Sequence, residues 1–140
     1  MYSDHDLVLS LGTVAHTGAA SYAATMSDFY IIDLGASPRI GDGDNPPEFV
    51  VKLTTKSGEN SFTVNLVGDT AVGMTTSPLT LASIYFAGDE NSGEVKRAHV
   101  MAGLAGRRYI GITITGATAG DGITIEAHLA PKAGTANSEM

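Results

Sequence analysis

Cysteine and tryptophan are both absent from this chain of 140 residues. Without thiols, the sequence excludes thiol catalysis, zinc sites built on cysteine and a disulfide scaffold. A single domain of this length buries roughly 70% of the surface that its unfolded chain would expose, so neither a disulfide nor a metal is needed to hold the fold. The absence of tryptophan also removes the aromatic platform that carbohydrate-binding sandwiches usually present.

Positive charge is scarce. The sequence has 8 Lys and Arg against 15 Asp and Glu, a formal net charge of −7. Phosphate backbones repel a net-negative surface, so we expect no nucleic-acid partner. No Lys or Arg occurs before Arg39, whereas Lys96, Arg97, Arg107 and Arg108 are half of all the basic residues. This basic segment either attracts the acidic N-terminal third or faces a different neighbour, and two ordinary solvated regions are the simpler interpretation.

An apolar run long enough to cross a membrane is also missing, because a membrane helix needs about 20 such residues. The apolar segment 7–11 is far shorter than that. The Asp4-His5-Asp6 before it has the wrong charge for a signal peptide. We therefore expect a soluble protein with no membrane partner and no cleaved leader.

The clearest pattern lies in residues 108–130, where apolar and polar side chains alternate. This period of two is typical of a pleated strand with one buried face. The predicted inward positions are Ile110, Ile112, Ile114, Ile123, Ile125, Ala127 and Leu129. The glycine-rich connection 116–122 is longer than a tight hairpin prefers, so it either bridges adjacent strands or turns a corner between sheets.

Five further segments predict strands, with glycine-rich or polar loops between them. They are 28–34, 48–55, 62–66, 79–87 and 95–101. The turn at 56–60 has a suitable length and chemistry to join 48–55 and 62–66 as a hairpin. The total is seven strands, or eight if part of the N-terminal segment pairs, and no helix of three turns is visible.

Many short alternating strands joined by glycine-rich turns predict an all-β fold. We expect two antiparallel sheets packed face to face, a sandwich of the jelly-roll type, with an open barrel as the alternative. The expected organisation is an extended N-terminal arm over 1–27, the sandwich over 28–131 and a C-terminal tail over 132–140. Such an arm either frays or lies on another surface.

No motif supports catalysis. A Gly-x-Ser-x-Gly nucleophile motif is absent, and so is a phosphate-binding loop, because neither Gly-Lys-Ser nor Gly-Lys-Thr occurs. Glu126 and His128 share an outward strand face, which is more typical of a surface pair than of general acid–base catalysis. We therefore predict that the protein is not an enzyme and needs no cofactor.

Metal binding has little support either. Residues 42–45, Asp-Gly-Asp-Asn, begin like a calcium loop, but Pro46 and Pro47 follow and no glutamate closes the twelve-residue pattern. The histidines stand apart, with none at i+2 or i+4 of another to chelate a metal. They are His5, His16, His99 and His128. We expect a plain acidic loop and no metal.

A carbohydrate- or small-ligand-binding β-sandwich is the alternative function. The phenylalanines Phe29, Phe49, Phe62 and Phe86 fall at core-like positions. Only tyrosines therefore remain as stacking platforms for a sugar. They are Tyr2, Tyr22, Tyr30, Tyr85 and Tyr109.

Several short segments resemble a known family. They are Ile31-Ile-Asp-Leu-Gly35, Arg39-Ile-Gly-Asp-Gly43, the Phe-Val-Val-Lys-Leu strand at 49–53, Thr80-Leu-Ala82 and Arg108-Tyr-Ile-Gly-Ile-Thr-Ile114. Over roughly residues 27–130, the chain is similar to the cement, or decoration, proteins of short-tailed bacteriophages of the Bordetella type. These motifs are structural rather than chemical.

The resemblance implies a jelly-roll module that is made in the host cytoplasm and sits as a homodimer on the outer capsid surface of the virion. There it ties neighbouring copies of the major capsid protein together, with no catalytic residues. For the contacts we expect arm residues and a basic spot that faces acidic groups of a neighbour: Leu7, Val8, Leu9 and Leu11, then Arg97, Arg107 and Arg108. An equal interpretation is that residues 7–11 are an edge strand of the same sandwich.

Overall fold

Eight β-strands make up the regular structure of the computed structural model, which describes residues 8–12, 30–33, 48–58, 61–89, 92–100, 107–116 and 122–130. They are β1 (Val8–Leu11), β2 (Ile32–Asp33), β3 (Glu48–Ser57), β4 (Phe62–Asp69), β5 (Leu79–Phe86), β6 (Val95–His99), β7 (Tyr109–Thr115) and β8 (Gly122–Ala130). No helix among the described residues is long and apolar enough to cross a membrane.

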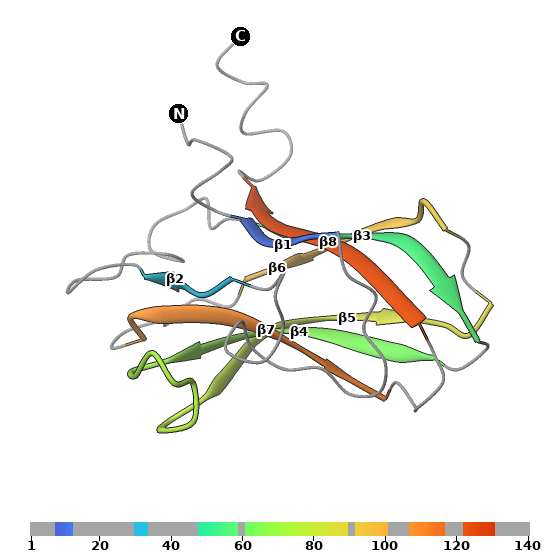
Figure 1. Cartoon of the computed structure of the whole chain (residues 1–140). Helices are drawn as coiled ribbons and strands as arrows, with labels where there is room; N and C mark the ends of the chain where they lie inside the picture. Colours follow the sequence, from blue (N-terminus) through green and yellow to red (C-terminus); the bar gives the residue numbers. More distant parts are fainter. Residues whose placement is uncertain are drawn as a thin grey trace, which may run out of the picture.

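The strands form two four-stranded sheets that lie face to face as two layers (Figure 1). Sheet A has the order β1-β8-β3-β6, and sheet B has the order β2-β7-β4-β5. Every pairing in both sheets is antiparallel. The predicted all-β sandwich of two antiparallel sheets is therefore confirmed.

Most connections between strands cross from one sheet to the other. The predicted hairpin of 48–55 with 62–66 is wrong, because β3 belongs to sheet A and β4 to sheet B. β4 pairs instead with β5 and β7. The two interpretations of the 116–122 connection are also resolved, since β7 lies in sheet B and β8 in sheet A. That connection turns a corner between sheets.

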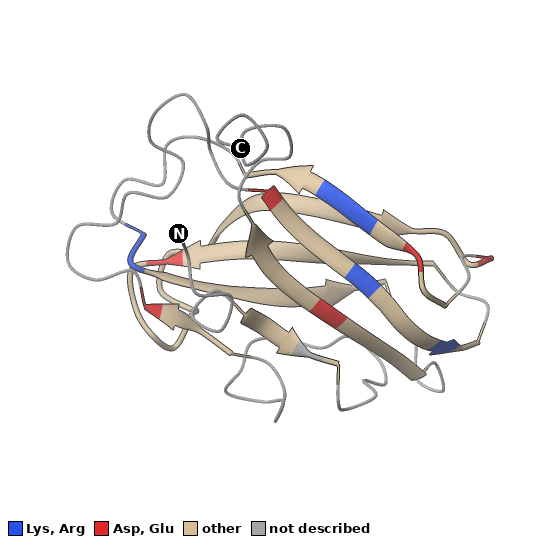
Figure 2. Cartoon of the chain, turned by 90° about the horizontal axis from the view of Figure 1, so that it is seen from above, with Lys and Arg blue, Asp and Glu red and all other residues tan. Residues whose placement is uncertain are grey.

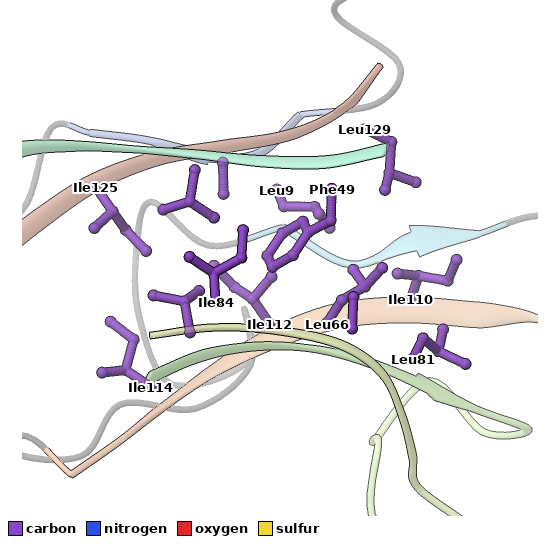
Figure 3. Close-up of a cluster of buried hydrophobic side chains, with 14 of the residues drawn as sticks. Leu9, Phe49, Leu66, Leu81, Ile84, Ile110, Ile112, Ile114, Ile125 and Leu129 are labelled. Atoms are coloured by element: carbon purple, nitrogen blue, oxygen red, sulfur yellow. The ribbon is translucent and has the colours of Figure 1, made fainter. Parts of the chain in front are cut away.

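The core fills the space between the layers with side chains from both sheets (Figure 3). All seven inward positions predicted within 108–130 are buried. Phe62 and Phe86 stack with their ring centroids 5.0 Å apart and their planes 12° apart, and Phe49 is completely buried. Complete burial of one such side chain contributes about 1.5–3 kcal/mol. The alternation in the sequence therefore places inward the side chains whose burial stabilises the fold.

The segment Val8–Leu11 is an edge strand of sheet A and pairs with β8. Leu9 is fully buried in the core, and the Ser10 hydroxyl donates to the carbonyl oxygen of Ile125 at 2.8 Å. Of the two interpretations of this segment, the structure shows the edge strand. The rest of the predicted arm (1–7 and 13–27), the strand residues 28, 29 and 34, and the tail at 132–140 lie outside the described residues.

Candidate interaction surfaces

A buried aspartate organises the loop that follows β4. Asp69 is the last residue of β4 and is completely buried. Its carboxylate accepts hydrogen bonds from the main-chain N–H groups of Thr70, Ala71, Thr76 and Ser77. Aspartate suits this position because a short carboxylate can satisfy backbone donors that a turn leaves unpaired. We call residues 70–78 the Asp69 loop.

The charge on Asp69 is favoured in spite of its burial. Burial raises the pKa of the Asp69 carboxyl, but hydrogen bonds from Ala71, Ser77 and Thr70 together lower it by more than burial raises it. The pKa therefore lies below its ordinary value of 3.8. The donors stabilise the charged form because they point their N–H dipoles at the anion. At neutral pH the loop is therefore wrapped around a carboxylate.

The Asp69 loop buries one apolar side chain and exposes another. Met74 adopts a left-handed backbone conformation (φ 59°) and is 1% exposed, and its N–H donates to the carbonyl oxygen of Ala71 at 3.0 Å. Val72 is 60% exposed. With Met74 packed inward and Asp69 binding the backbone, the loop holds Val72 outward in a fixed conformation.

Two of the predicted contact arginines lie at the same end of sheet B as this loop. Asp69, Tyr109 and Asp33 stand opposite one another on β4, β7 and β2. Arg108 makes a two-point ion pair with Asp33, with Nε–Oδ1 at 2.6 Å and Nη2–Oδ2 at 2.9 Å. The pair raises the pKa of the Arg108 guanidinium above its ordinary value, through the hydrogen bonds and the charge of Asp33.

Arg107 joins the loop directly. Its Nη2 lies 3.4 Å from the hydroxyl oxygen of Ser77, while its Nε is buried without a hydrogen-bond partner among the described residues. The stem of Arg107 packs against Gly68, where an added Cβ would lie 3.2 Å from the Arg107 Cβ. The Asp69 loop, Arg107, Arg108 and Asp33 together form what we call the loop end of sheet B.

The third predicted arginine lies elsewhere. Arg97 is on β6 in sheet A, with Nη1 3.9 Å from the Glu48 carboxylate. Lys52 and Glu126 form a second ion pair at 3.8 Å across the outer side of the same sheet. In Figure 2, basic (blue) and acidic (red) positions both occur on the strands of sheet A. The basic segment of the sequence is therefore divided between the two sheets, because the chain crosses from β6 to β7 between Arg97 and Arg107.

The predicted apolar contacts also have different surroundings. Val8 is half-buried on β1, and Leu9 is part of the domain's own core. Leu11 is the last residue of β1. Leu7 lies outside the described residues. Of these residues, Val8 is the one whose described side chain keeps some exposure.

The remaining titratable residues do not converge into a metal site in the part of the chain that the structure describes. Glu126 is exposed beside Lys52, and His128 is half-buried on the same strand. His99 is exposed at the end of β6. The acidic stretch 42–45, His5 and His16 lie outside the described residues.

Sequence reasoning did not single out Asp69. A signal was present, because an aspartate at the end of an alternating strand precedes a loop rich in threonine, serine and glycine that ends in Pro78. Comparison of the chain with protein-family models and with curated proteins gives no match.

Proposed function

We propose that this chain is a structural virion protein, a cement or decoration protein that binds the outer surface of an icosahedral bacteriophage capsid as a homodimer. It stabilises the contacts between neighbouring major capsid proteins and performs no catalysis. Eight strands in two four-stranded sheets support the jelly-roll module that the family resemblance implies.

The observation that carries the proposal is the construction of the loop end. An exposed valine on a loop fixed by a buried carboxylate is a preordered contact, since the loop loses little conformational freedom on binding. Arg107 beside it supplies a donor group for acidic partners. The loop end therefore combines an exposed apolar side chain with a basic residue that contacts the same loop, as expected of a small docking surface.

The mechanism is mass action on the assembled shell. A module that binds only the expanded lattice stabilises it in proportion to the logarithm of its concentration over its dissociation constant. A specific contact buries at least about 1,000 Å², although repetition over the lattice and bivalent binding by a dimer let weaker contacts succeed. One contact site of moderate affinity on each chain is therefore sufficient to hold the protein on the shell.

The test uses expanded shells assembled from the major capsid protein encoded in the same genome. We expect Val72→Asp to reduce binding of the purified protein to these shells at least tenfold, because a charge would replace the exposed apolar side chain. Val95→Asp is the matched control, since Val95 is also an exposed valine (47%) but lies on β6 of sheet A. Equal binding by the two variants would exclude the loop end as the capsid contact.

A second candidate function is supported by one observation. Tyr85 is 58% exposed. On the same sheet, the Asn65 side-chain amide donates to the Thr113 hydroxyl at 3.2 Å and accepts from the Ser83 hydroxyl at 2.8 Å. An exposed ring next to fixed hydroxyl groups is the kind of surface on which a sugar stacks. A glycan array tests this carbohydrate-binding alternative, and an array without signal would remove it.

A further inference from the structure

One sheet edge is much longer than the others. Within the described strands, sheet A ends at β1 and β6 and sheet B ends at β2 and β5. These edges have four, five, two and eight residues respectively. The β5 sequence Leu-Thr-Leu-Ala-Ser-Ile-Tyr-Phe carries no charge, whereas β6 carries Lys96, Arg97 and His99. A long, uncharged edge strand presents unpaired backbone groups that favour addition of another strand.

The backbone groups that face this open edge can be identified. The Lys96 Nζ donates to the carbonyl oxygen of Tyr85 at 2.9 Å, and Lys96 belongs to β6 of the other sheet. The Tyr85 carbonyl therefore points away from β4. In an antiparallel strand, both main-chain groups of a residue point to the same side, and the next residue but one repeats that direction. Ser83 and Tyr85 thus direct their N–H and C=O groups to the open edge.

The geometry points to β5 as the strand through which two copies of this chain pair, antiparallel about a twofold axis at Ile84, so that their B sheets join into one continuous sheet. This inference rests on the homodimer in the proposed function and not on capsid binding. The register uses both outward-directed residues, because Ser83 of each copy then faces Tyr85 of the other. Beyond Ala82, the register shift between Leu66 and Val67 interrupts the regular pairing with β4.

The side chains of β5 are complementary to themselves in this register. On the outer face, Ser83 stands opposite Tyr85 of the second copy, and on the inner face Ala82 stands opposite Phe86 of the second copy. The axis itself pairs Ile84 with its own counterpart. Each small residue therefore meets a large one, so the facing side chains of the two strands do not compete for the same space.

Charge distinguishes the β5 edge from the β6 edge as a surface for pairing two copies. A twofold pairing through β6 centred on Arg97 would set Arg97 against Arg97 of the second copy, and like charges directly opposite one another destabilise a sheet. Pairing through β5 brings together no charged residue of the strand itself. A twofold pair also uses the open β5 edge of each copy, so the assembly closes at two copies instead of growing.

Lys96 makes this edge selective. Its ammonium donates a hydrogen bond to the Tyr85 carbonyl oxygen and lies 5.1 Å from the centroid of the Phe86 ring. In the dimer, the Ser83 N–H of the second copy replaces the ammonium at that carbonyl, and Lys96 keeps its place over the ring. A lysine next to an edge strand disfavours indiscriminate strand addition. Only a strand that fits the whole register compensates for the lost hydrogen bond between Lys96 and the Tyr85 carbonyl.

Engineered cysteines test the register directly, because the natural chain has none. The variants Ser83→Cys and Tyr85→Cys are purified separately, mixed and oxidised without any shell present. Directly opposed residues in an antiparallel pair have Cα atoms about 5.5 Å apart, within disulfide range. Two copies of the same variant place their thiols diagonally, at about 7–8 Å, which is too far. Thr113→Cys mixed with Thr115→Cys on the interior strand β7 is the control.

We expect a covalent dimer in the mixture of Ser83→Cys and Tyr85→Cys and at least tenfold less in either variant alone or in the control. Sedimentation equilibrium of the natural chain should give twice 14.4 kDa. A monomer mass, or a dimer mass without the selective cross-link, overturns the inference. A monomer that still binds shells would overturn the β5 dimer, and with it the homodimer, but would leave capsid binding standing. A cross-linked dimer that does not bind shells would overturn capsid binding and leave the β5 dimer standing.

Discussion

Asp69 and Ser77 stand at the two ends of one loop and are held together by a single main-chain N–H. The Ser77 N–H lies 3.0 Å from one carboxylate oxygen of Asp69 and 3.1 Å from the other. Because the carboxylate also binds Thr70, Ala71 and Thr76, the loop is closed around one charge. The shape of the loop end, and with it the exposure of Val72, depends on that side chain.

Replacing Asp69 by asparagine should therefore destabilise the protein. Asp69→Asn keeps the volume but turns one acceptor oxygen into a donor, which leaves buried N–H groups without partners. We expect the free energy of unfolding to fall by about 2–3 kcal/mol. Chemical denaturation measures the change, and Asp89→Asn, at an exposed aspartate, is the control that should change by less than about 0.5 kcal/mol. Equal effects of the two substitutions would contradict the role of Asp69.

Acid should weaken the same loop. The pKa of Asp69 is lower in the folded protein than its ordinary value of 3.8, so the carboxylate stabilises the fold fully above that value. The stabilisation is lost as the pH falls through the lower folded-state pKa. We expect the stability difference between the natural chain and Asp69→Asn to stay constant from about pH 7 to pH 5 and to shrink below about pH 4. A difference that grows in acid would show the opposite pKa shift.

Strand β1 gives a separate prediction about stability. Leu9→Ala removes a fully buried side chain that packs between the sheets, and we expect a loss of about 2–5 kcal/mol. Val8→Ala, at a half-buried position on the same strand, should cost clearly less. Thermal unfolding compares the two variants. Equal and small losses would mean that the segment does not dock as an edge strand of sheet A.

The arginines of the loop end should differ in their effect on capsid binding. Arg108 is already bound at two points by Asp33, while Arg107 keeps a weak contact to Ser77 at 3.4 Å. We expect Arg107→Gln to weaken binding to expanded shells roughly two- to fivefold and Arg108→Gln to weaken it less. The difference should narrow as salt is raised. A larger and salt-independent effect of Arg108→Gln would contradict this assignment.

The faces of the strands could be predicted from the sequence, but the partners of the strands could not. A period of two decides which side chains point inward, as Ile112 and Ile125 show, because each pleat alternates sides. It does not decide which strand lies alongside. The segments 48–55 and 62–66 both pack against one core from opposite sheets, and their alternation is the same as that of a hairpin.

The candidate site could be predicted from the sequence only in part, for a similar reason. Arg97 and Arg107 are close in sequence, yet the chain crosses between the sheets from one to the other. The role of Asp69 depends on a loop that returns to it eight residues later, at Ser77. Such closure is a tertiary property, whereas the composition of 68–78 indicated only that a loop was present.

The most direct test of the proposed function is a saturation measurement of the natural chain on expanded shells. Increasing amounts of protein are added, the shells are sedimented, and bound protein is compared with the major capsid protein. We predict saturation at a fixed ratio, together with shells that resist heating better than uncoated ones. Protein that stays in the supernatant, or binding that rises without saturating, would contradict the proposal.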